Sequence, residues 1–110
     1  MTVEQLRAFG ADTEDGLKRC MNNEAFYLKL VDKAVRDPAF DRLKDALEAG
    51  DLNTGFELAH ALKGMTTNLS LTPIAGPVVE MTELLRSRTQ TDYGPLMGEI
   101  LKKRDELLGM

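Results

Sequence analysis

Cysteine, histidine and tryptophan are nearly absent from this chain of 110 residues, which has one cysteine, one histidine and no tryptophan. The single cysteine, Cys20, excludes an internal disulfide and a cysteine-based zinc cluster. Because His60 is the only histidine, most transition-metal sites also lack ligands, and no convergent catalytic set is present. The sequence therefore predicts no metal site and no cofactor, and an enzyme is the least favoured class of function.

Long apolar runs and an excess of positive charge are also missing. No apolar run approaches the ~20 residues needed to cross a bilayer, and residues 1–10 have neither the basic nor the apolar region of a signal peptide. The net charge of −4 argues against nucleic acid, which favours a basic patch. We therefore expect a cytoplasmic protein that binds neither membranes nor nucleic acid.

Strand signals are absent as well, because no run alternates with period two and the β-branched residues are scattered. Residues typical of helix starts and stops are frequent instead. They predict two short helices, one from Thr2 to Gly10 and one that begins at Thr13. A third helix begins at Asn22 or Asn23 and is interrupted at Asp37-Pro38, after which a fourth runs to Gly50. A fifth helix runs from Asp51 to about Leu69, a sixth begins at Thr72, and the last begins at Thr91 or Asp92.

The longer predicted helices have short connections, which is typical of an antiparallel bundle. We expect an all-α fold, an antiparallel up-down four-helix bundle in a single domain (residues 1–110) with two short N-terminal helices covering one end. Pro77 should delay or kink its helix near the start. The inward face of the last helix is expected at Leu96, Ile100, Leu101, and Leu107 or Leu108.

The helix that carries His60 has two distinct faces. At about 100° per residue, one face carries the apolar residues expected to form the bundle seam, namely Leu58, Leu62, Met65 and Leu69. The opposite face carries His60, Lys63, Gly64 and Thr67. A lone histidine among apolar neighbours is more often a buried core residue, but the helical phase predicts that His60 points to solvent.

Two neighbours of His60 indicate a surface that another molecule approaches. Gly64 lies one turn after His60, although glycine inside a helix costs about 1 kcal/mol relative to alanine. Without a side chain there, a partner can come close to the imidazole. Lys63 places an ammonium group on the same face. Phe56, one turn before His60, is interpreted either as a residue at the edge of the core or as a docking contact.

An exposed imidazole, a cation and a bare stretch of backbone fit a phosphoryl acceptor better than a general base. A general base usually needs an orienting carboxylate and an adjacent nucleophile, and neither is supplied by the neighbours of His60. The ammonium of Lys63 can offset the charge of a phosphoryl group.

These residues resemble the core motif of the histidine-containing phosphotransfer (HPt) domain family of two-component phosphorelays. The motif stands here as His60, Leu62, Lys63 and Gly64, followed by Asn68 and Leu69, and the resemblance runs from about Gly10 to Leu108. It implies that His60 accepts a phosphoryl group from a receiver-domain aspartate and passes it to another receiver. It also implies that the receiver, found in response regulators and hybrid histidine kinases, supplies the catalysis and the magnesium. We expect such a carrier to be a monomer.

Two positions depart from the family pattern. Ser70 stands where the family often has glycine, and Thr82 stands where the family often has a glutamine or glutamate that can bond the other nitrogen of the imidazole. Thr82 is the candidate for that hydrogen bond, and Glu83 is a possible substitute nearer the outside of its helix.

The alternative is a helical adaptor that transfers nothing and binds a signalling partner through the face made by Phe56, His60 and Gly64. The presence of His60, Lys63 and Gly64 together favours the carrier, because an adaptor needs none of them.

Overall fold

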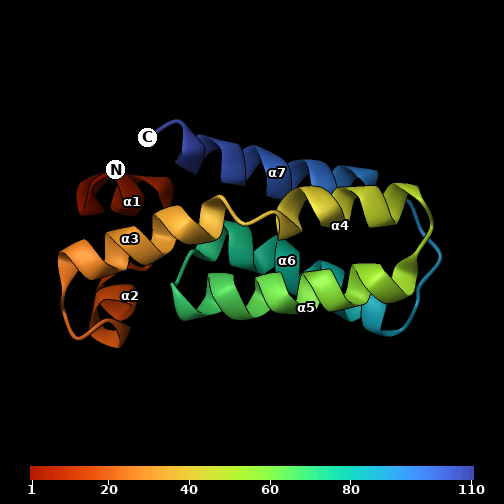
Figure 1. Cartoon of the computed structure of the whole chain (residues 1–110), viewed down its shortest axis with the longest axis horizontal. Helices are drawn as coiled ribbons and strands as arrows, with labels where there is room; N and C mark the ends of the chain where they lie inside the picture. The colour runs from red at the N-terminus through yellow and green to blue at the C-terminus, as the bar shows by residue number, and fades with distance from the viewer.

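The computed structural model describes residues 1–110, and α-helix is the only regular secondary structure in it (Figure 1). The helices are α1 (Val3–Phe9), α2 (Thr13–Arg19), α3 (Glu24–Val35), α4 (Ala39–Glu48), α5 (Leu52–Asn68), α6 (Thr72–Arg86) and α7 (Gly94–Leu108). Helices α4 to α7 run up and down along the longest axis and form an antiparallel bundle, with α1 and α2 at one end. The predicted fold class is confirmed. No helix is both long and apolar enough to span a membrane.

The predicted interruption at Asp37-Pro38 separates α3 from α4. Helix α3 ends at Val35, and Pro38 is the N-cap of α4. A proline disfavours helical backbone angles in the residue before it, and the Asp37 carboxylate accepts a hydrogen bond from the Ala39 N–H at 2.8 Å. The two helices therefore follow one another along the bundle as separate segments (Figure 1).

Several predicted helix starts are confirmed by side-chain caps. Thr2 and Gln5 form a reciprocal capping box at the start of α1. Asn23 at α3 and Asp51 at α5 each accept a hydrogen bond from the backbone N–H three residues later, at 3.0 and 3.1 Å. The cap at Asp51 marks the start of the helix that carries His60.

Two other starts differ from the prediction. The cap of α2 is Asp12 and not Thr13, whose side chain is buried inside the first turn. The cap of α6 is Leu71 and not Thr72, and the Leu71 side chain is buried in the core. The expected delay at Pro77 is wrong, because α6 begins at Thr72 and has completed its first turn before Pro77, which lies inside the helix.

Helix α7 differs from its prediction in both its start and its inward face. The N-cap is Tyr93 and neither Thr91 nor Asp92, although the Asp92 carboxylate accepts a hydrogen bond from the Gly94 N–H at 2.8 Å. Leu96 and Leu101 are only half-buried and Leu108 is exposed, whereas the predicted Ile100 and Leu107 are buried. The other buried positions are Met97 and Arg104.

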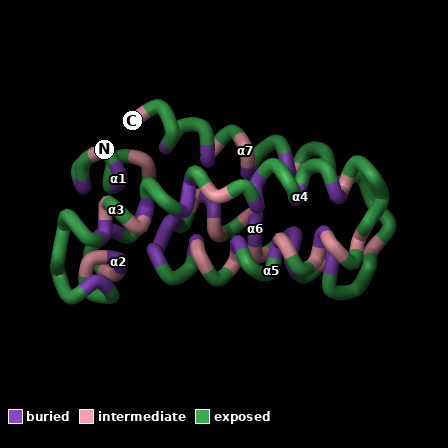
Figure 2. The backbone as a smooth tube through the Cα atoms, viewed as in Figure 1, coloured by how far each residue is buried: buried purple, intermediate pink, exposed green.

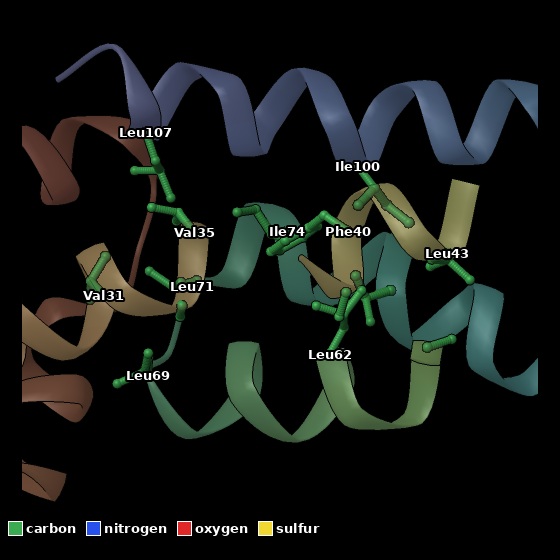
Figure 3. Close-up of a cluster of buried hydrophobic side chains, with 14 of the residues drawn as sticks. Val31, Val35, Phe40, Leu43, Leu62, Leu69, Leu71, Ile74, Ile100 and Leu107 are labelled. Atoms are coloured by element: carbon green, nitrogen blue, oxygen red, sulfur yellow. The ribbon is translucent and has the colours of Figure 1, made fainter. Parts of the chain in front are cut away.

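The core lies along the inner edges of the bundle helices, whose outer edges are exposed (Figure 2). Twenty-two buried residues form one cluster. Helices α3 to α7 and the loop between α5 and α6 contribute side chains to it. Figure 3 shows many of them, including Val31, Phe40, Leu62, Ile74 and Ile100. Because α5 contributes Ala59, Leu62 and Thr66 to this interior, its opposite face is left to solvent.

The N-terminal helices are tied to the C-terminal end of α5 by two side-chain hydrogen bonds. The Tyr27 hydroxyl donates to the Leu69 carbonyl at 2.9 Å, and burial raises the pKa of this phenol to about 12. The Ser70 hydroxyl donates to the Asp15 carboxylate, and this bond and the neighbouring Arg19 lower the pKa of Asp15. Gly16 lies so close to Tyr27 that a Cβ atom there would be 2.5 Å from the phenol oxygen. Helices α2 and α3 therefore hold the end of the histidine helix in place.

Candidate functional site

His60 lies midway along α5, on the face turned away from the core, and its side chain is exposed as predicted. Its ring has one aromatic neighbour, Phe56, with ring centroids 5.8 Å apart and planes inclined at 39°. No ion pair or side-chain hydrogen bond engages the imidazole, whereas the neighbouring Lys63 and Thr67 both have such partners. Both ring nitrogens of His60 are therefore open to an approaching molecule.

Gly64 leaves the surface beside the imidazole bare. It is exposed, and a Cβ atom built on it would meet nothing within 4 Å. No packing requirement thus explains a glycine here, inside a helix where alanine would be more favourable. Thr67, one turn later, is exposed as predicted, and its hydroxyl donates to the Lys63 carbonyl at 2.6 Å.

Lys63 lies at the edge of α5 that faces α6. Its side chain is 34% exposed, and its Nζ is 3.9 Å from Oε1 of Glu83. The other carboxylate oxygen of Glu83 is 3.4 Å from Nε of Arg86. One carboxylate thus lies between two cations beside His60. Glu83, the possible substitute for Thr82, does lie at the site, but it contacts Lys63 and not the imidazole.

Phe56 is half-buried and lies between two arginine side chains from the end of α6 and the loop that follows. The guanidinium carbons of Arg86 and Arg88 are 5.1 and 5.0 Å from the centre of the ring. Arg88 also donates to the Asn53 side chain at 2.7 Å and to the Leu85 carbonyl at 2.6 Å. Phe56 is therefore part of the surface next to His60 and is in contact with two cations.

Neither arginine was identified from the sequence. The spacing of Glu83 and Arg86 within one helix was a usable signal, because residues three apart are neighbours. Arg88 gave no such signal. It reaches Phe56 after the chain leaves α6 with a left-handed backbone angle at Arg88 itself, φ +51°.

The hydrogen bond suggested between Thr82 and the imidazole is not formed. Thr82 is completely buried, and its hydroxyl donates to the Val78 carbonyl at 2.7 Å within α6. Because its side chain lies in the interior while His60 lies on the outer surface, the structure gives Thr82 a packing role. This departure from the family pattern leaves the imidazole without an orienting hydrogen bond.

The site is an open surface and not a pocket. None of the cavities in the molecule is lined by His60 or Lys63, and no group of three or more potential ligand side chains is arranged to hold a metal ion. Small-molecule sites are usually concave and bury most of their ligand. An exposed nucleophile on a convex helix is instead accessible to the concave surface of another protein.

An exposed histidine on an up-down helical bundle, flanked by a lysine and a bare glycine, is the arrangement that the sequence predicted for a phosphoryl carrier. The family model of the Hpt domain matches residues 37–109, which include the whole of α4 to α7 and all the site residues described above. The chain belongs to the Hpt domain family. No curated protein and no solved structure matches it. Hpt domains act in two-component phosphorelays, where they carry phosphoryl groups and interact with receiver domains.

Proposed function

We propose that this protein is a phosphorelay intermediate in which His60 accepts a phosphoryl group from a receiver-domain aspartate and passes it to another receiver. The observation that carries the proposal is the exposed, unbonded imidazole one turn before the open backbone at Gly64. Within the Hpt family, this combination supplies a nucleophile together with the space that a protein donor needs to reach it.

The transfer needs only one reactive group on this chain. The unprotonated ring nitrogen of His60 attacks the phosphorus of the phosphoaspartate, an N–P bond forms, and the P–O bond to the aspartate breaks to release its carboxylate. The other ring nitrogen then gives up its proton to solvent. Transfer to a second receiver reverses these steps on a new aspartate: the N–P bond breaks, a new P–O bond forms, and the imidazole regains its proton.

Lys63 supports this reaction by electrostatics. Its ammonium is on the edge of the same face and is partly shielded from water, so it can offset the charge of the phosphoryl group on His60. The receiver supplies the magnesium and the catalytic carboxylates, and this chain contributes the nucleophile, the cation and the docking face.

The alternative is a non-transferring adaptor that binds a signalling partner through the face of Phe56, His60 and Gly64. It would use the same surface without forming an N–P bond. Transfer of label therefore separates the two functions.

The experiment is to incubate the protein with a panel of receiver domains phosphorylated with radioactive phosphate. We expect label to move to this chain from at least one receiver and to be lost in acid but retained in alkali, as a phosphoryl group on a ring nitrogen is. Addition of an unlabelled second receiver should remove the label. Binding of a receiver without any transfer of label would favour the adaptor.

A further inference from the structure

The side chains on the α6 side of His60 form a basic–aromatic cluster, which consists of Phe56, Arg86 and Arg88. It continues the row begun by Lys63 and Glu83. The row carries three cations and one anion in a chain whose net charge is −4. On the other flank of His60 lies the exposed carboxylate of Glu57, one turn before it on α5. The histidine thus lies on a boundary between a positive and a negative edge.

The contacts within the cluster leave most of its hydrogen-bonding capacity unused. A guanidinium group has five N–H donors. Arg88 uses Nε and Nη1 for its bonds to Asn53, Leu85 and Arg86 and leaves Nη2 free, while Arg86 pairs with Glu83 through Nε. Both residues are exposed. Stacking on Phe56 orders the two guanidinium groups without covering their outer edges, so they remain available to anions of a partner.

We propose that the basic–aromatic cluster recognises carboxylates at the rim of the receiver's phosphoaspartate site and so orients the receiver on His60. The inference rests on the proposed function. It names a recognition surface that this function does not require, because transfer itself needs only His60 and its nearest neighbours.

The position of the cluster supports this assignment. Phe56 is one helical turn from His60, and their ring centroids are 5.8 Å apart. A specific protein interface covers about 800 Å² on each partner, so a receiver whose aspartate reaches His60 also covers the cluster. The centre of that receiver is anionic because it presents a phosphorylated carboxylate. Carboxylates at the rim of that centre would fit the edge with Arg86 and Arg88 better, by charge, than the edge with Glu57.

Charges at the rim of an interface act mainly on encounter rate and salt dependence. The test measures initial transfer rates from the receivers of the panel against receiver concentration, at low and at high salt. The double variant Arg86→Gln/Arg88→Gln removes both charges and keeps polar side chains. We expect the receiver concentration for half-maximal rate to rise about tenfold at low salt, the salt dependence to flatten, and the rate at saturation to change much less.

Two matched variants separate recognition from structure. Arg86→Lys/Arg88→Lys keeps the charges and should retain most of the salt dependence. Arg7→Gln removes one exposed charge from α1, at the far end of the bundle from the cluster, and should match wild type. Thermal melts of all variants show whether the glutamine double variant is folded at the assay temperature.

Three results would overturn the proposal. They are an unchanged concentration dependence in the folded glutamine double variant, a lysine double variant as impaired as the glutamine one, and failure of every receiver in the panel to transfer to or bind wild type at low salt. Labelling of wild type by the small donor phosphoramidate, without any receiver, tests the nucleophile by itself. Label on His60 from phosphoramidate together with either of the first two results leaves the proposed acceptor intact and rejects only the role of the cluster. Failure of every receiver would count against transfer from receivers as well.

Discussion

Lys63 and Glu83 face each other across the boundary between α5 and α6, with Nζ and Oε1 3.9 Å apart. Lys63 is the cation beside the proposed phosphoryl acceptor. Glu83 therefore competes with a phosphoryl group on His60 for the Lys63 ammonium. The carboxylate also pairs with Arg86 at 3.4 Å, so it keeps two cations in place while it repels any anion that arrives on His60. This opposition gives Glu83 a predicted effect on the energy of the phosphorylated state.

Glu83→Gln should shift the transfer equilibrium toward phosphorylated His60. Removal of the carboxylate frees the Lys63 ammonium for the phosphoryl group and takes one negative charge from its surroundings. The effect should be about two- to fivefold, because exposed charges are screened by water and salt. The ratio of labelled protein to labelled receiver at equilibrium measures it. Glu80→Gln makes the same charge change at another exposed position of α6, and an equal shift in this control would contradict a specific role for Glu83.

Two glycine-to-alanine changes should have opposite effects on stability. Gly64→Ala should raise the free energy of unfolding by about 0.5–1 kcal/mol, because alanine is the better helix former and the added Cβ meets nothing. Gly16→Ala should lower it by about 1–3 kcal/mol, because the Cβ would overlap the buried ring of Tyr27. Chemical denaturation of the two variants beside wild type measures both. If both variants changed the free energy of unfolding in the same direction, the packing described at one of the two positions would be contradicted.

Gly64→Gln should slow phosphoryl transfer without loss of fold. A long side chain one turn after His60 covers the surface over which the receiver approaches, and a small displacement of reacting groups costs a large factor in rate. We expect initial transfer to slow by about tenfold or more, with Gly64→Ala much less affected. A glutamine variant that transfers as fast as wild type would show that the bare backbone is not needed for access.

Tyr27 should make the fold sensitive to alkali in a defined window. Its pKa is raised from 10.0 to about 12 in the folded protein, so the folded state disfavours the phenolate. The stability that this shift represents is fully present below pH 10 and is lost as the pH rises toward 12. Tyr27→Phe removes the titrating group and the bond to Leu69, so it should be less stable at neutral pH, by about 1 kcal/mol, but should lose less stability through this window. Denaturation curves at a series of alkaline pH values test both statements, and parallel losses in the two proteins would contradict them.

The fold and the centre of the site were predictable because local rules determine them. The cap at Asp51 begins α5, and the helical period then places His60 opposite Leu62, which is buried. The same rules put Lys63 and Gly64 beside His60, and the structure agrees.

The remaining features depend on contacts between segments far apart in the sequence. Arg88 reaches Asn53 and Phe56 only after the chain turns at the end of α6, and the need for glycine at Gly16 arises only when α3 brings Tyr27 against it. Arg104 shows the limit of pattern rules most clearly. It is a charged residue on the buried face of α7, where it stacks 5.4 Å from the centre of the Phe40 ring and pairs with Asp41 at 3.3 Å. A hydrophobic pattern assigns such a residue to the surface.

Label transfer from the same phosphorylated receiver to wild type and to His60→Gln decides whether His60 is the acceptor. Glutamine fits the helix and keeps a polar tip, but it has no nucleophilic ring nitrogen. Because His60 is exposed, the substitution should change stability by no more than about 0.5 kcal/mol, which thermal melts of the two proteins check. We expect label on the wild-type protein, located at His60 by peptide mapping, and none on a fully folded His60→Gln variant. Label that persists on His60→Gln would place the acceptor elsewhere and contradict the proposed function of His60.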